Sequence, residues 1–271
     1  MLILLRMVKY TISIFMILGL AFSSGVFSVL LYNKYAAGGA IAFQSSSTVA
    51  YAEVQTPPSP QVTIVPQPTP AAAKSAMIKV PIINQNPELP SGCEVTSLTM
   101  LLQYKGIRKD KMQLAKEMKF DPTEITWDKN GNIAYWGNPN TGYVGDVYGN
   151  RKGFGIYHLA LMDLLLKYIP SGVDLTRKDF SVLEQQVSNG IPVVVWTTIN
   201  YTEPNNWVVW DSPLGPIKTT FSEHSVVLVG FDETNVYLND PLSGKRGVAV
   251  DKALFIRSWE ILGKQAISYT K

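Results

Sequence analysis

The sequence predicts an α+β fold, because helical patterns come first along the chain and strand-like runs follow. Apolar residues recur at helical spacing over Cys93–Lys105, Tyr157–Tyr168 and Asp179–Ser188. The pattern then changes to runs of β-branched and aromatic residues at Ile191–Ile199 and Ser225–Phe231, which are typical of buried strands. Helices followed by antiparallel strands indicate the α+β class.

The N-terminus is predicted to be a membrane anchor. Tyr10 to Tyr32 contains no charged residue and is long enough to cross a bilayer as a helix. Arg6 and Lys9 precede this run, which favours an N-terminus inside the cell and the rest of the chain outside. We therefore expect residues 1–36 to be an anchor. A cleaved signal segment, giving a secreted protein, is the alternative.

A proline-rich segment is predicted to link the anchor to one globular domain. Residues 37–76 form this linker, and six prolines lie among Ser, Thr, Gln, Val and Ala in its later part, a composition that favours extended, solvated chain. Residues 77–271 are long enough for a single domain with a sizeable core. The net charge of +3, on 24 basic and 21 acidic residues, gives no argument for a nucleic-acid partner.

The remaining elements of the domain follow from local patterns. A strand-like run at Met77–Asn84 precedes the first helix, and residues 119–155 are predicted to form a long irregular excursion rich in glycine, asparagine and aromatic residues. Further elements are expected in this order: a helix capped by Asp110 with Gln113 in a capping box, strands at 235–238 and 247–250, a helix from Asp251 to about Leu262, and a last strand at 265–269.

Cys93 is the only cysteine of the chain and stands where the first helix begins. A free cysteine is usually a small buried hydrophobe. Here, however, the thiol lies at a helix N-terminus, where unpaired N–H groups and the helix dipole favour the thiolate. We therefore expect a depressed thiol pKa and a nucleophilic role for Cys93.

A histidine and an aspartate lie far downstream at positions that a hairpin brings together. His224 precedes the strand Ser225–Phe231, and Asp240 ends the next strand. If the two strands pair, these side chains become cross-strand neighbours, and the carboxylate can bind one ring nitrogen and fix the tautomer. The other histidine, His158, begins an apolar helix, where a structural role is expected.

Two weaker signals complete the site. Gln85 precedes the turn into the first helix, and its amide N–H is a candidate donor to an oxyanion beside the backbone N–H of Cys93. A surface glutamine is the alternative. Two isolated histidines without a cluster of other ligands make a poor zinc set, so neither a metal nor a cofactor is expected.

Two blocks of sequence resemble a known family. VPIINQNPELPSGCEVTSLTMLLQYKG and FSEHSVVLVGFDETNVYLNDPLSG are similar to the bacterial double-glycine-peptidase-like (bacteriocin-leader peptidase-like) group of the papain-like superfamily, in particular to its stand-alone extracytoplasmic members. The resemblance covers roughly Met77 to the C-terminus. It implies a papain-like fold, in which the helix carrying Cys93 packs on an antiparallel sheet carrying His224 and Asp240.

The resemblance also implies roles: Cys93 as nucleophile, His224 as general base, Asp240 as orienting group and Gln85 as oxyanion donor. Gln85 stands further from Cys93 than is usual in the family. Glu94 follows the cysteine where exporter-linked members usually have a glycine, and there is no transporter module.

The expected activity is hydrolysis of a peptide or amide bond in a peptide or protein substrate, with a cell-wall peptide among the candidates. Two alternatives stay open. One is a non-catalytic extracytoplasmic binding module, served by the aromatic- and glycine-rich loop at residues 127–155. The other is a thiol acyltransferase or transpeptidase with the same three residues.

Overall fold

The computed structural model describes residues 73–271. The predicted anchor, residues 1–36, lies outside this part, as does all but the end of the predicted linker. Within the described part, no helix combines the length and the apolar character that crossing a membrane requires.

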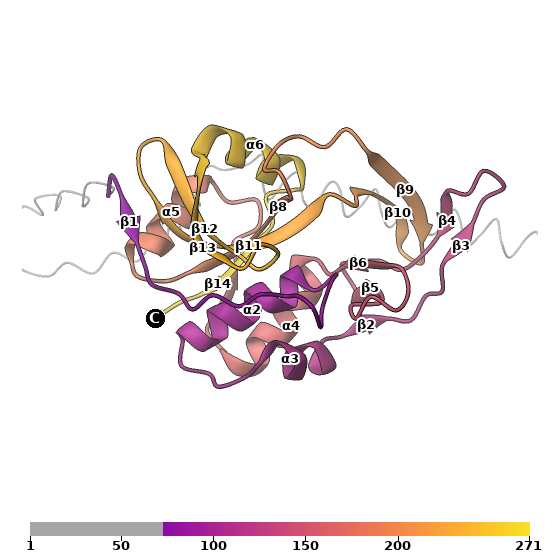
Figure 1. Ribbon diagram of the computed structural model, residues 1–271, viewed down its shortest axis with the longest axis horizontal. Coiled ribbons are helices and arrows are strands. Elements are labelled where there is room, and N and C mark those ends of the chain that lie inside the picture. Colours follow the sequence, from indigo (N-terminus) through magenta and orange to yellow (C-terminus); the bar gives the residue numbers. More distant parts are fainter. Residues whose placement is uncertain (1–72) are drawn as a thin grey trace, which may run out of the picture. The chain divides into compact units, whose positions relative to one another are not determined.

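A seven-stranded antiparallel sheet forms the centre of the domain (Figure 1). Six strands follow one another in the order β13-β12-β11-β8-β14-β7, and the short β1 pairs with the far end of β11. The strands are β1 (Ala76–Met77), β7 (Gly172–Asp174), β8 (Val193–Thr198), β11 (Glu223–Phe231), β12 (Asn235–Asp240), β13 (Lys245–Asp251) and β14 (Ala266–Tyr269).

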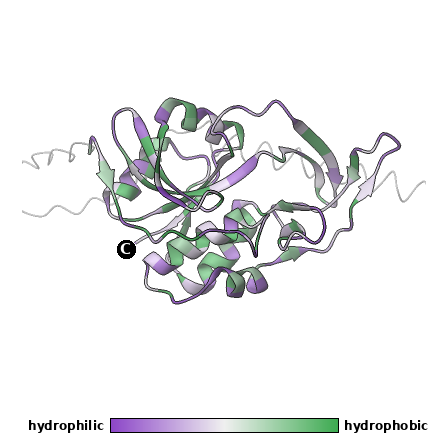
Figure 2. Ribbon diagram, viewed as in Figure 1, coloured by the Kyte–Doolittle hydropathy of each residue, from purple (hydrophilic) through white to green (hydrophobic). Residues whose placement is uncertain are grey.

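Within residues 73–271, five helices accompany the sheet: α2 (Cys93–Tyr104), α3 (Lys111–Glu117), α4 (His158–Tyr168), α5 (Phe180–Ser188) and α6 (Lys252–Ile261). Helices α2, α3 and α4 share one hydrophobic core with the sheet, whereas α5 and α6 share a second core with it. The hydrophobic colouring of α4 in Figure 2 reflects the apolar residues that it contributes to the first of these cores.

The two central strands are buried on both faces. In β8, Val194 and Trp196 belong to the core with α2 and α4, while Val193 and Val195 belong to the core with α5 and α6. Strand β11 alternates in the same way. Side chains of opposite faces alternate along a strand, so a strand covered on both sides is a continuous apolar run. This double burial explains the sequence VVVW in β8.

The prediction that residues 119–155 form an irregular excursion is wrong in part, because these residues contain five short strands. These are β2 (Phe120–Asp121), β3 (Thr126–Trp127), β4 (Ile133–Tyr135), β5 (Tyr143–Gly145) and β6 (Gly153–Gly155). Strands β2, β5 and β6 form one small sheet, and β3 and β4 join the hairpin β9 (Trp207–Ser212) and β10 (Gly215–Thr220) in another. Most of these strands have only two or three residues, which is too short for periodicity to reveal.

These small sheets have their own core, made of Ile133, Trp136, Val144, Phe154, Trp210 and Ile217. The rings of Trp136 and Trp210 pack at a tilt of 55° with centroids 5.5 Å apart, and Phe154 lies edge-on to Trp210 at 5.1 Å. The sequence analysis did not anticipate the β9–β10 hairpin. The hairpin does not pair with the central sheet. Trp210 of β9 and Ile217 of β10 instead pack into this small core.

Most other predicted elements are confirmed within a few residues, including the capping box between Asp110 and Gln113. The run Met77–Asn84 is the exception, since only Ala76–Met77 is a strand. The following residues are held by other contacts, such as Ile78 N to Val229 O at 2.8 Å. Proline at position 81 has no N–H to donate to a ladder.

We predict that truncating Leu98 destabilises the domain strongly. Leu98 is fully buried in the core beneath α2, so Leu98→Ala should lower the free energy of unfolding by about 2–5 kcal/mol. Leu214→Ala is the matched control, because Leu214 is 71% exposed and should change stability by less than about 0.5 kcal/mol. Denaturant unfolding of the three proteins tests this, and equal losses would contradict the assigned core.

Candidate active site

Cys93 is the first residue of α2, and the preceding turn brings it close to the sheet. Gly92 fits this turn because a Cβ there would lie 2.7 Å from Cβ of Leu89. One turn into the helix, Ser97 Oγ donates a hydrogen bond to the carbonyl of Ser225 on β11 at 3.1 Å. The beginning of α2 is thereby fastened to the strand that carries His224.

His224 and Asp240 lie together as the hairpin prediction required. His224 Nε2 and Asp240 Oδ1 are 2.7 Å apart, and both residues are buried. Burial opposes ionisation of Asp240, but hydrogen bonds from His224, Ser243 and Leu242, together with the charge of His224, lower its pKa to about 2. The carboxylate is therefore ionised at neutral pH and holds Nε2, which leaves Nδ1 of the imidazole free for another partner.

The thiol of Cys93 lies beside β11 but donates its hydrogen bond elsewhere. Cys93 Sγ is 3.3 Å from Glu94 Oε2, and a backbone hydrogen bond from Ser225, the residue after His224, acts on the same sulfur. The hydrogen bonds of residues 73–271 do not include one between Cys93 and His224. A thiolate–imidazolium pair therefore stays a prediction.

The prediction that the Cys93 thiol has a depressed pKa is wrong for this arrangement. Burial raises the thiol pKa well above its ordinary value, and the charges of Glu94 and Glu223 raise it further. The backbone hydrogen bond from Ser225 lowers the pKa but does not offset these effects. The helix N-terminus favours the thiolate only by about 0.3–1 kcal/mol at an exposed position, whereas removing a charge from water costs several kcal/mol.

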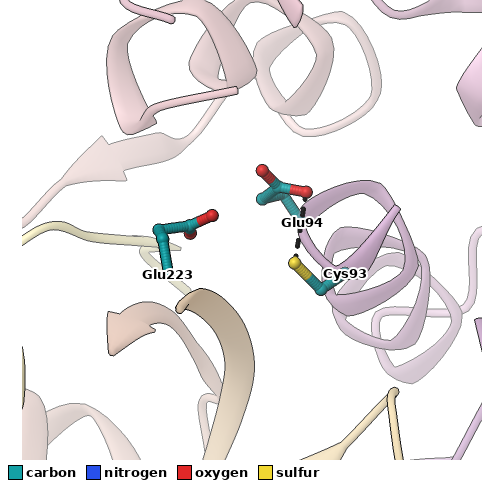
Figure 3. A group of neighbouring side chains, drawn as sticks. All are labelled: Cys93, Glu94 and Glu223. Atoms are coloured by element: carbon teal, nitrogen blue, oxygen red, sulfur yellow. Dashed lines mark hydrogen bonds between the residues drawn. The ribbon is translucent and has the colours of Figure 1, made fainter. Parts of the chain in front are cut away.

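Glu94 and Glu223 are site residues that the sequence analysis missed. Figure 3 shows both carboxyl groups beside the Cys93 sulfur, and the ligand atoms of the three residues all lie within 4.8 Å of one another. Glu94 is fully buried and Glu223 is 7% exposed. The signals were an acidic residue directly after the cysteine and another directly before the histidine, but adjacency in sequence does not reveal that both side chains point inward.

Burial dominates the electrostatics of the two glutamates. It raises the pKa of Glu94 to about 7, even though the backbone N–H of Ile156 donates to Glu94 Oε1 at 2.8 Å. Burial, and secondarily the charge of Glu94, raise the pKa of Glu223 well above its ordinary range. Both carboxyl groups therefore favour their neutral forms far more than exposed glutamates do.

Gly155 makes room for this pair. A Cβ on Gly155 would lie 2.2 Å from Glu94 Oε1 and 3.3 Å from Glu223 Oε2. The glycine ends β6. Because it has no side chain, the backbone of the small sheet β2-β5-β6 lies directly against the carboxyl groups.

Gln85 is buried next to the turn that follows Asp240. Its backbone N–H donates to Pro241 O at 2.8 Å, and its side-chain Nε2 donates to Pro90 O at 2.7 Å. Its Oε1 is buried without a hydrogen-bond partner. Lys111 holds the segment that carries Gln85 by donating to Asn84 O and Gln85 O at 2.6 and 2.8 Å. A surface glutamine is thus excluded, and the second amide hydrogen of Nε2 is free for a role in the site.

His158 stands in a different environment. It begins α4, and its Nδ1 is 2.8 Å from Asp174 Oδ2 at the end of β7. Its backbone N–H donates to Gln265 Oε1 at 3.2 Å. These contacts fit the structural role that the sequence predicted for it.

Helix α2 begins with the cysteine and packs on an antiparallel sheet that carries the histidine and the aspartate. This arrangement is the papain-like cysteine peptidase fold. The chain belongs to the Peptidase_C39 like family, whose model matches residues 77–267. This finding confirms the resemblance drawn from the two sequence blocks.

Two similar proteins come from Bacillus. The uncharacterized protein YvpB of Bacillus subtilis (strain 168) is 40% identical over 186 residues, which are 68% of this chain and 71% of that protein. A crystal structure from Bacillus anthracis, described as a C39-like peptidase, is 41% identical and has a TM-score of 0.67. The match covers 73% of this chain and 98% of that structure.

We predict that Glu94 makes stability fall as the pH rises. Its pKa is about 7 in the folded protein against an ordinary value of 4.5, so between these values the unfolded chain binds fewer protons than the folded protein. Glu94 should contribute about 3 kcal/mol to the decrease in the free energy of unfolding across this window. Glu94→Gln keeps an acceptor for Ile156 N–H and should lose this contribution, while Glu223, whose pKa is also raised, keeps its own.

Denaturant unfolding at several pH values between 4.5 and 8 measures the effect. Glu203→Gln serves as the control, because Glu203 lies in an exposed loop and should retain the wild-type slope. A Glu94→Gln protein with an unchanged slope would contradict the assignment.

Proposed function

We propose that this protein is a cysteine peptidase that hydrolyses a peptide or amide bond with Cys93 as nucleophile, His224 as general base and Asp240 as orienting group. The observation that carries the proposal is the His224–Asp240 hydrogen bond of 2.7 Å, on strands fastened to the helix that begins with Cys93. Its membership in a peptidase-like family supports the same reaction class.

The raised thiol pKa determines how the reaction begins. Because Cys93 favours its neutral form, a preformed ion pair is not required, and His224 removes the thiol proton as the sulfur attacks the carbonyl carbon. This requires the thiol to turn from Glu94 toward the free Nδ1 of His224. Asp240 stabilises the resulting imidazolium, which then protonates the leaving amine, and water releases the acyl group.

The oxyanion of the tetrahedral intermediate needs hydrogen-bond donors. The backbone N–H of Cys93 is one of the unpaired groups at the start of α2, and the free amide hydrogen of Gln85 is the proposed second donor. The contact between Gln85 N–H and Pro241 O joins this donor to the turn that carries Asp240.

A cavity of about 450 Å³ offers a place for the substrate. Its lining includes Trp127, Lys152, Trp207 and Phe221. Phe221 lies three positions before His224, so the cavity adjoins the proposed catalytic strand. Trp127 is 51% exposed, and Lys152 Nζ lies 4.1 Å from the centre of the Phe221 ring. The lining also contains Asp128, which balances the charge of Lys152, so the aromatic surface suits a peptide with apolar or aromatic side chains.

A non-catalytic binding module is the second candidate. The state of the thiol favours it: Cys93 is buried, its thiol donates a hydrogen bond to Glu94, and its pKa is raised. In this case the cavity at Trp127 and Trp207 would bind the ligand, and Cys93 would be a structural residue.

Labelling of Cys93 with a peptidyl electrophile distinguishes the two candidates. His224→Ala should slow labelling at neutral pH by about 100-fold or more, because general-base catalysis is lost. Asp240→Asn should slow it less, because only the orientation and stabilisation of the imidazole are disturbed. His158→Ala is the matched control and should label at the wild-type rate. If all four proteins label equally slowly, the binding module is favoured.

We further propose that residues 1–36 anchor the protein in the cell membrane, with the domain on the extracytoplasmic side. The apolar run at residues 10–32 and the basic residues before it support this placement. Protease added to intact cells should cut in the proline-rich segment and release the domain, as detected with an antibody against residues 77–271. Complete protection of the domain in intact cells, with cleavage after lysis, would contradict the orientation.

A further inference from the structure

Three acidic groups converge in the interior beside α2. Cys93 Sγ, a carboxylate oxygen of Glu94 and one of Glu223 lie within 4.8 Å of one another (Figure 3). Glu94 uses one oxygen for the backbone of Ile156 and the other for the thiol. Oε1 of Glu223, by contrast, is buried without a hydrogen-bond partner. Figure 3 shows this carboxyl group pointing toward Glu94 and Cys93.

This cluster has no cationic partner among residues 73–271. The lysines that form ion pairs in this part of the chain contact other carboxylates. Buried charges are normally paired or bound to a metal, and a buried polar atom without a partner costs about 1–3 kcal/mol. The cluster therefore either keeps its protons or exchanges them for a cation.

The geometry is compatible with a single small ion. Zinc binds sulfur at about 2.3 Å and carboxylate oxygen at about 2.0–2.2 Å in tetrahedral sites, so two ligand atoms on one ion lie roughly 3.5 Å apart. The three ligand atoms of the cluster lie within 4.8 Å of one another, and a movement of about 1 Å by the Glu223 side chain brings them to zinc-binding distances. The backbone of Gly155, which leaves space at the two carboxyl groups, provides room for that movement.

We propose that Cys93, Glu94 and Glu223 form a binding site for a divalent transition-metal ion such as Zn²⁺. Each residue supplies one ligand atom, and the protons of the thiol and of the carboxyl groups pass to solvent as the ion binds. The thiolate selects a borderline-soft ion over Mg²⁺ or Ca²⁺. The bound ion holds the sulfur lone pair, so Cys93 cannot attack an electrophile. The site is therefore a reversible block on the thiol.

The two histidines, which make a poor zinc set, are not part of this site. Neither His158 nor His224 is required as a ligand, and the inference does not rest on the proposed peptidase activity. Because binding displaces protons, the affinity should increase with pH.

The test uses the purified full-length chain with Zn²⁺ as the probe, measured by competition with a chromophoric chelator. The rate at which iodoacetamide alkylates Cys93 is the second readout. Wild-type protein should bind one Zn²⁺, and saturating Zn²⁺ should suppress alkylation. Co²⁺ in place of Zn²⁺ should give a thiolate-to-metal charge-transfer absorption that Cys93→Ser lacks.

Glu223→Gln should weaken Zn²⁺ binding by about 100-fold or more, because even a partner in the outer shell of a metal site contributes about 10–100-fold. Asp174→Asn is the matched control, since it removes the carboxylate that contacts His158, and should bind Zn²⁺ as the wild type does. His224→Ala should also retain binding.

Two outcomes overturn the proposal. In the first, Zn²⁺ does not protect the wild-type thiol from alkylation. In the second, binding persists in Glu223→Gln but is lost in His224→Ala, which would assign the ion to the thiol and imidazole. If Glu223→Gln is misfolded by circular dichroism, Glu94→Gln takes its place with the same expected loss.

Discussion

The packing of α2 against β11 is the contact on which the rest of the site depends. Val95 and Leu98 of the helix lie in the same core as Val227 and Val229 of the strand, and Ser97 fastens the beginning of the helix to Ser225. This packing sets the position of the thiol along β11, near Ser225 and Glu223. The β11–β12 hairpin then places Asp240 against His224. The site is therefore fixed by an apolar interface rather than by its own polar contacts.

The same interface excludes water, and this determines the charge state of the site. The fully covered Glu94 and the nearly covered Glu223 have raised pKa values, and so has the thiol between them. Asp240 experiences burial too, but the hydrogen bonds that it accepts lower its pKa. One site thus contains carboxyl groups of opposite character. Glu94 also accepts hydrogen bonds, but burial outweighs them there, whereas the hydrogen bonds and the charge of His224 outweigh burial at Asp240.

The small sheets β2-β5-β6 and β3-β4-β9-β10 extend the domain beside the site. Gly155 at the end of β6 contacts the carboxyl pair, and Phe154 joins the aromatic cluster that also contacts Phe221. The cavity and the buried cluster are therefore neighbours through two adjacent residues. A ligand at Phe221 has a direct structural connection to the environment of Cys93.

The sequence by itself determined the order of helices α2–α6 and of strands β8 and β11–β14, the pairing of His224 with Asp240, and the position of Cys93 at the start of a helix. Each depends on patterns within a few residues or on one short hairpin, where local periodicity and turn residues carry the information. The pKa of Cys93, the inward direction of Glu94 and Glu223, and the order of residues 119–155 depended on tertiary structure. The thiol is affected by the charge of Glu94, its neighbour in the chain, and by that of Glu223, which lies far away in the sequence. Only packing brings these groups together and removes the water that would screen them.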